Sequence, residues 1–265
     1  MATRVAARRP MGLGDLLDGT FGIYRQHFGT FVALGAIFLL PELLLNLVLR
    51  LAGPSNAFIA AQALVSWFLG LALYAAMIPP SAEAALGATP SVVGALRRVG
   101  PRLGPVLRLG LLYTLALGLM AVTVVGIPLA IYFVVAWAFP YHALLLEDLG
   151  IKAALARSRS LARGSWWRVF GLLLLLSVLT FGILLVLSLP AALAEGLDRL
   201  LDPAQAEQSG AGIVLGELTT FVAQILAYPI GVIGWTLLYY DLRLRKEGLD
   251  LELRAHELAS TPPAG

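Results

Sequence analysis

Six stretches of the chain are each long and apolar enough to cross a lipid bilayer as a helix, and they limit the possible folds more than any other feature. They comprise residues 28–49, 57–78, 106–125, 127–146, 169–189 and 213–239. A helix needs about 20 mostly apolar residues to cross about 30 Å of hydrocarbon. Charged residues make up 13% of the chain, about half the share of a soluble domain, so soluble barrels and doubly wound sheets are excluded.

Glycine and proline divide one apolar run, whereas Pro41, Gly70 and Pro229 inside other spans are expected to mark kinks and not ends. The third and fourth form one apolar run, which we divide at Gly126 and Pro128 because an unbroken helix would be about twice as long as the bilayer is thick. After Pro190, at the end of the fifth span, we expect a long outer connection that is rich in acidic residues.

Positive charge is distributed unevenly between the two ends of the predicted spans. Of the 19 Lys and Arg residues, 17 fall on one side, and Arg50 and Arg199 fall on the other. Basic loops are retained in the cytosol, so both termini are predicted to lie inside. The predicted organisation is a basic N-terminal tail (1–11), a polytopic helical membrane domain (12–248) and a C-terminal cytoplasmic tail (249–265). The predicted fold class is an all-α integral membrane protein with six transmembrane helices.

Three amphipathic helices are predicted on the cytoplasmic side, one before each odd-numbered span. The first comprises residues 15–27, the second begins at an N-cap at Thr89, and the third comprises residues 150–163. Several basic residues of the last two helices are candidates for contact with anionic phospholipid: Arg97, Arg98, Arg102, Lys152, Arg159 and Arg163. The alternative is that these charges only set the topology. The threefold pattern fits either three helix-plus-hairpin repeats or convergence, because every inner loop needs basic residues. Nucleic acid is not an expected partner, since no module interleaves aromatic and basic residues.

Polar side chains within the first, second and last spans form a candidate intramembrane cluster: Glu42, Asn46, Gln62, Glu217 and Gln224. They converge on one outward-facing cavity if these three helices are neighbours. Ionisable groups at membrane depth are rare and mark functional sites by default. The first interpretation is therefore a binding or proton-relay site. The second is hydrogen bonding between helices, with Arg50 or external water as a partner.

We expect no catalytic centre, no metal and no cofactor. The chain has no cysteine, which excludes disulfides, thiol catalysis and cysteine-based metal sites. It also lacks a nucleophile elbow, a P-loop and an HExxH pattern. His142 is assigned to the inner membrane interface rather than to a ligand site.

Three short motifs are distributed along the chain. The first comprises Arg9, Pro10, Gly14, Asp18, Phe21, Tyr24, Arg25 and Phe28. The second comprises Glu147, Gly150, Ala154, Leu155, Arg157, Ser158, Leu161, Gly164, Trp167 and Arg168. The third comprises Tyr239, Tyr240, Asp241, Arg243, Arg245, Glu247 and Gly248.

Together these motifs resemble the membrane-domain family named after glycerophosphoryl diester phosphodiesterase. The resemblance implies a stand-alone multi-pass protein of the bacterial cytoplasmic membrane. It does not imply the phosphodiesterase activity, because 25 residues follow Tyr240 and a catalytic barrel needs about 250.

Several residues of these motifs are predicted to anchor the fold: Glu147, Arg157, Trp167, Arg168, Asp241 and Arg245. Arg157 is predicted to pair with Glu147 or Asp148, and Asp241 with Arg245 one helical turn later. The predicted function is that of a non-enzymatic scaffold or accessory protein at the inner membrane face, which contacts anionic lipid or a partner protein. The alternative is a small transporter or channel with a polar cavity around Glu42 and Glu217.

Overall fold

The computed structural model describes residues 11–52, 56–201 and 210–247, and all regular elements in these ranges are helical. The predicted tails, apart from Met11, lie outside the described residues. The long helices are α2 (Phe28–Ala52), α3 (Asn56–Ala85), α5 (Leu103–Ala121), α9 (Trp166–Leu201) and α11 (Gly210–Glu247). The shorter ones are α1 (Leu13–Gln26), α4 (Val92–Val99), the 3-10 helix η1 (Gly100–Arg102), α6 (Gly126–Ala136), α7 (Pro140–Leu146) and α8 (Ile151–Ala162).

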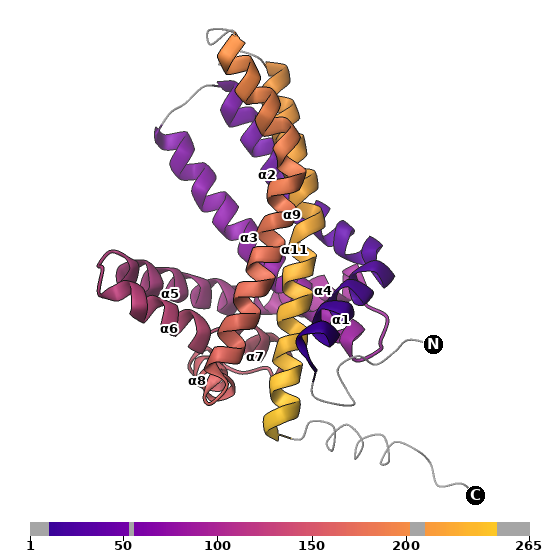
Figure 1. Ribbon diagram of the computed structural model, residues 1–265, viewed down its shortest axis with the longest axis vertical. Coiled ribbons are helices and arrows are strands. Elements are labelled where there is room, and N and C mark those ends of the chain that lie inside the picture. The colour runs from indigo at the N-terminus through magenta and orange to yellow at the C-terminus, as the bar shows by residue number, and fades with distance from the viewer. Residues whose placement is uncertain (1–10, 53–55, 202–209, 248–265) are drawn as a thin grey trace, which may run out of the picture.

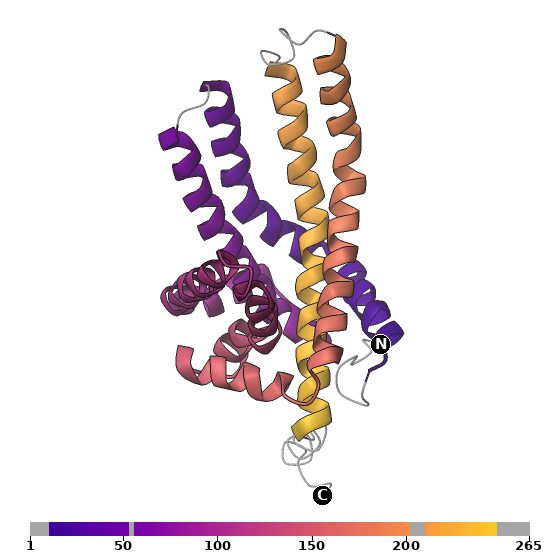
Figure 2. The same ribbon diagram turned by 60° about the vertical axis from the view of Figure 1, so that its left-hand side comes forward.

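Six helical segments within the described ranges are long and apolar enough to cross a membrane. They coincide with the six predicted stretches, so the prediction of an all-α, multi-pass membrane protein is confirmed at this level. Four of the helices, α2, α3, α9 and α11, run along the bundle, and α11 packs against the other three (Figures 1 and 2).

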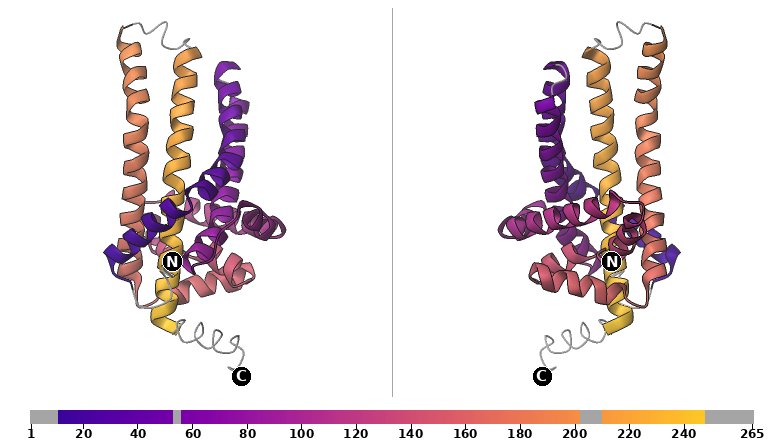
Figure 3. Two further views of the ribbon diagram at one scale, coloured as in Figure 1. Left: turned by 90° about the vertical axis from the view of Figure 1, so that its right-hand side faces the viewer. Right: turned by 90° about the vertical axis from the view of Figure 1, so that its left-hand side faces the viewer.

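The remaining two apolar helices, α5 and α6, form a hairpin that runs across the lower half of the bundle instead of along it (Figures 1 and 3). α5 packs on α3, α6 packs on α9, and α8 lies below α6 (Figure 1). The turn of the hairpin requires Gly126, because a Cβ atom there would lie 1.8 Å from the carbonyl oxygen of Met120. The predicted division of the apolar run at Gly126 is therefore correct.

The predicted fourth span, residues 127–146, is not one continuous helix. α6 ends at Ala136 and α7 begins at Pro140, a residue that is favoured at the first helical position and disrupts a helix that precedes it. The Ser158 hydroxyl on α8 donates to the carbonyl oxygen of Ala136 at 2.9 Å and accepts from the N–H of Phe139 at 3.0 Å. The break is thus stabilised by a side chain from another helix.

Two other helices continue through prolines and beyond the predicted spans. α3 runs through Pro79 and Pro80 to Ala85, and α9 runs through Pro190 to Leu201. The apolar span of α9 ends at Pro190, within one residue of the prediction, whereas that of α3 extends to Ala85. The long connection expected directly after Pro190 was wrong, because residues 191–201 continue α9. A helix in an apolar environment retains its other backbone hydrogen bonds because no water competes for them. The shortened connection, 202–209, lies outside the described residues.

The buried core lies at the lower end of the molecule, where the short helices meet the bundle. Its largest fully buried side chains include Leu16, Phe31, Met77, Phe139 and Tyr239. The upper halves of the four long helices instead expose large apolar side chains, as expected for surfaces that contact lipid.

Short helices α1, α4 and α8 precede α2, α5 and α9, where the sequence predicted amphipathic helices. The predicted start of the second at Thr89 was wrong by two residues. The N-cap is Ser91, whose hydroxyl accepts from the N–H of Gly94 at 3.0 Å, because only an N-cap side chain reaches the third N–H of the helix. The position of these helices at a membrane interface remains a prediction.

Candidate functional site

The lower end of the molecule contains two adjoining groups of ion pairs. In the first, Nε of Arg157 on α8 donates to the Glu147 carboxylate at 2.8 Å, and its terminal nitrogens donate to both oxygens of Glu247 on α11. Arg243 also donates to Glu247, at 3.2 Å, and the Tyr239 hydroxyl donates to Glu147. The hydrogen bond to Glu247, together with the one to Glu147, raises the pKa of Arg157 against the opposing effect of burial.

Asp241 on α11 is the centre of the second group. This fully buried carboxylate accepts from the backbone N–H of Met11 at 2.7 Å, from Arg168 at 2.9 Å and from Arg245 at 3.0 Å. Both arginines also donate to the carbonyl oxygen of Met11. The second group therefore connects Met11, two residues before α1, with the beginning of α9 and the end of α11.

We call the two groups together the lower cluster; its members are Glu147, Arg157, Arg168, Asp241, Arg243, Arg245 and Glu247. Both ion pairs predicted from the sequence, Arg157 with Glu147 and Asp241 with Arg245, are present. The contacts of Arg157 with Glu247 and of Arg168 with Asp241 join residues 90 and 73 positions apart, so no local spacing could reveal them.

Trp167 and its neighbour are placed differently by the structure. The Trp167 side chain is 77% exposed, whereas Trp166 stacks on Phe170 with ring centroids 5.2 Å apart. An exposed indole next to Arg168 at the beginning of a long apolar helix is typical of a residue at headgroup depth.

The candidate lipid-contacting residues divide into partnered and exposed side chains. Arg98 pairs with Glu83 at 3.4 Å and Arg102 pairs with Asp148 at 2.7 Å. The Arg159 guanidinium lies 5.7 Å from the ring centroid of Phe133 on α6. Three side chains are exposed and have no ion-pair partner within the part of the chain that the structure describes: Arg97, Lys152 and Arg163.

The candidate intramembrane cluster is brought together only in part. α2, α3 and α11 are neighbours, as convergence requires, and the buried carboxylate of Glu217 pairs with Arg50 at 2.8 Å. The side-chain oxygen of Asn46 is buried without a hydrogen-bond partner among the described residues. Within the described ranges, no hydrogen bond joins any two of the five cluster residues. The remaining three members, Glu42, Gln62 and Gln224, are therefore not linked to Asn46 or Glu217 by hydrogen bonds in this part of the chain.

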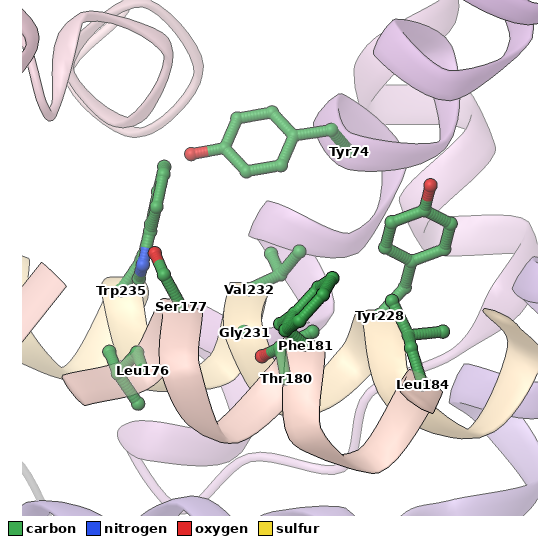
Figure 4. Close-up of a pocket in the computed structure, with 10 residues that line it drawn as sticks. All are labelled: Tyr74, Leu176, Ser177, Thr180, Phe181, Leu184, Tyr228, Gly231, Val232 and Trp235. Carbon is green, nitrogen blue, oxygen red and sulfur yellow. The ribbon is translucent and has the colours of Figure 1, made fainter. Parts of the chain in front are cut away.

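A cavity of about 300 Å³ lies between α3, α9 and α11 (Figure 4). Its walls are mainly aromatic and aliphatic, and no member of the intramembrane cluster lines it. The hydroxyls of Tyr74 and Thr180, which both line it, are buried and lack a hydrogen-bond partner in the described part of the protein. The sequence offered no signal for this site, because its residues are the ordinary residues of three separate apolar stretches.

His142 lies in the protein core, and its predicted position at the level of the inner membrane interface stays a prediction. The side chain is fully buried, its Nε2 lies 3.2 Å from the Thr236 hydroxyl, and its ring stacks on Tyr239. The turn between α6 and α7 directs the His142 side chain into the core. A prediction that treats residues 127–146 as one unbroken helix cannot place it there. Within the described ranges, no group of three or more His, Cys, Asp or Glu residues could hold a metal ion.

Comparisons with protein-family models, with curated proteins and with solved structures each found no match to this chain. Its function is therefore inferred from its own residues.

Proposed function

We propose that the protein is a non-enzymatic membrane scaffold or accessory protein whose inner end binds the headgroups of anionic phospholipids. Arg97, Lys152 and Arg163 carry the proposal, because they expose positive charge that no described carboxylate neutralises. Nearby acidic side chains, among them Glu83 and Asp148, pair with other arginines. Each basic residue near an anionic leaflet contributes about 1 kcal/mol of attraction.

The layering of the lower end supports a membrane surface at this level. The α5–α6 hairpin exposes an apolar surface that includes Leu115, Leu119, Val124 and Ile131, whereas α8 below it carries basic side chains. Arg159 joins the two layers through its contact with Phe133. Both layers contact a matching part of the bilayer when the apolar hairpin lies in the hydrocarbon and the basic helix α8 lies among the headgroups.

The same layering favours four crossings of the membrane, by α2, α3, α9 and α11, with the hairpin lying within the inner leaflet. α6 has 11 residues, so it is about 16 Å long, which is half the thickness of the hydrocarbon core. Four crossings, like six, are an even number and leave both termini in the cytosol. The six crossings predicted from the sequence, in which residues 106–125 and 127–146 each cross the bilayer, are the alternative topology, since both segments are long and apolar enough to cross.

Membership of the family named after glycerophosphoryl diester phosphodiesterase, and with it a bacterial cytoplasmic membrane, is a proposal that rests on the three sequence motifs. The ion pairs formed by Arg157 and Asp241 give residues of two motifs a shared structural role. Contact with an unidentified partner protein remains part of the proposal for the inner face.

Lipid selectivity of the full-length protein tests the proposed function. The protein is reconstituted into nanodiscs that contain phosphatidylcholine and phosphatidylglycerol, and the co-purified lipids are quantified by native mass spectrometry. We expect enrichment of phosphatidylglycerol, and loss of most of this enrichment when Arg97, Lys152 and Arg163 are all replaced by Gln. The control replaces Arg98 and Arg102, which pair with Glu83 and Asp148, by Gln, and this variant should retain the enrichment of phosphatidylglycerol. Equal retention of the two lipids by the unmodified protein would exclude the proposal.

A further inference from the structure

We propose that the cavity between α3, α9 and α11 is a binding site for a lipid-soluble quinone, a planar ring that carries two carbonyl oxygens. The site is independent of the basic inner face. Figure 4 shows the rings of Tyr74, Tyr228, Phe181 and Trp235 around the cavity, and they come from all three helices.

Unsatisfied hydroxyls are the first reason to expect a ligand with hydrogen-bonding groups. Tyr74 and Thr180 each place a buried hydroxyl in the cavity wall, with no partner among the described residues. No bulk water reaches the hydrocarbon region, so an unpaired polar group there is costly. A phospholipid acyl chain has no acceptor to offer at this depth. The two carbonyl oxygens of a quinone are acceptors on a ring that is otherwise apolar.

The shape and chemistry of the walls give the second reason. Aromatic side chains pack favourably against other planar rings, in stacked or edge-to-face arrangements that a flexible methylene chain cannot form. Gly231 on α11 allows α11 to pack closely against α9 beside the cavity, because a Cβ there would lie only 3.3 Å from the Thr180 hydroxyl. The volume of about 300 Å³ is at the lower limit of the sites of about 300–1,000 Å³ that hold small molecules.

A route into the cavity from the membrane is the third reason. Phe181 and Tyr228, which line it, are 65% and 38% exposed on the surface of the bundle. Val178 and Leu185 on α9 add exposed apolar surface beside them. A quinone can therefore enter sideways from the lipid, with its ring inside and its isoprenoid tail along α9.

Water is the alternative occupant of a cavity with two hydroxyls. Ordered water requires two to four polar partners, and mainly apolar cavities stay dry. The lining here is dominated by aliphatic and aromatic side chains, so water satisfies the hydroxyls less well than a ring with carbonyl acceptors.

Photolabelling of the full-length protein in nanodiscs tests the proposal. An azido-substituted short-chain quinone is photolysed with the protein, labelled peptides are mapped by mass spectrometry, and decylubiquinone or oleic acid is added as a competitor. We expect saturable labelling of α9 and α11 near Thr180 and Trp235 that decylubiquinone suppresses and oleic acid does not. Unsaturable labelling, labelling elsewhere, or equal suppression by both competitors would overturn the proposal.

Variants separate hydrogen bonding from packing. Tyr74→Phe and Thr180→Val each remove one hydroxyl and should weaken quinone binding by about three- to tenfold, the effect of one lost hydrogen bond. Gly231→Leu fills the cavity and should abolish binding. Tyr132→Phe, on an exposed tyrosine of α6 outside the cavity, is the control and should bind as the unmodified protein does. Unchanged affinity of both Tyr74→Phe and Thr180→Val would exclude the site even if Gly231→Leu failed to fold.

Discussion

Arg157 on α8 and Glu247 at the end of α11 form a two-pronged ion pair between residues 90 positions apart in the chain. Because Arg157 also binds Glu147, one guanidinium connects the end of α7, the middle of α8 and the last turn of α11. A planar guanidinium group can donate hydrogen bonds to two carboxylates at once. The ammonium group of lysine cannot form the same paired hydrogen bonds.

Replacement of Arg157 should therefore destabilise the lower end of the protein. We expect Arg157→Ala to lower the free energy of unfolding by about 2–3 kcal/mol, because two partly buried carboxylates lose charged hydrogen bonds. Arg157→Lys should recover less than half of the loss. Thermal unfolding in detergent micelles measures the effect. The control is Arg159→Ala on the same helix, which should cost at most about 1 kcal/mol; equal costs for the two alanine variants would contradict the assigned role.

Replacement of Asp241 should have a larger effect. Asp241→Asn leaves Arg168 and Arg245 without their shared counter-charge at a fully buried position, and we expect a loss of about 3–5 kcal/mol. The matched control is Asp148→Asn, which removes an exposed partner of Arg102 and should cost less than about 1 kcal/mol. Chemical denaturation of the purified protein compares the two. A loss for Asp241→Asn as small as that of the control would show that the second group of ion pairs does not stabilise the fold.

The two glutamates of the intramembrane cluster should behave differently. Glu217→Gln removes the charge that pairs with Arg50 and should lower the melting temperature, whereas Glu42→Gln, which loses no described ion pair, should change it less. The transporter alternative makes a distinct prediction. If vesicles that contain the protein show solute or ion flux, and both variants abolish it without loss of stability, the cluster is a transport site and not a contact between helices.

The absence of cysteine from the sequence allows the topology to be measured with single introduced thiols. With four crossings, Asn56→Cys at the outer end of α3 should react with a membrane-impermeant maleimide added outside intact cells. Val124→Cys in the turn of the α5–α6 hairpin and Ala88→Cys before α4 should not react from outside. Outside labelling at Val124 would show instead that the hairpin crosses the bilayer.

Much of the architecture could be predicted because it depends on local composition. The six apolar segments, the turn at Gly126 and the short helices before α2, α5 and α9 all follow from the length of apolar runs and from residues with special backbone properties. The ion pair between Asp241 and Arg245 was predictable for the same reason, because its residues lie one helical turn apart. The prediction that Pro41 and Pro229 do not end their spans is confirmed, since α2 and α11 continue through them.

Sequence alone determined that six segments of this chain are long and apolar enough to cross a membrane, because the free energy of transfer into lipid depends on side-chain composition and segment length, whatever the fold. Only the tertiary structure decided the crosswise path of α5 and α6 and the break between α6 and α7, where the Ser158 hydroxyl forms hydrogen bonds on both sides. It also decided the ion pair of Arg157 with Glu247 and the cavity beside Tyr74. These features depend on distances between segments far apart in the chain. An apolar helix is equally compatible with many neighbours until packing selects one arrangement.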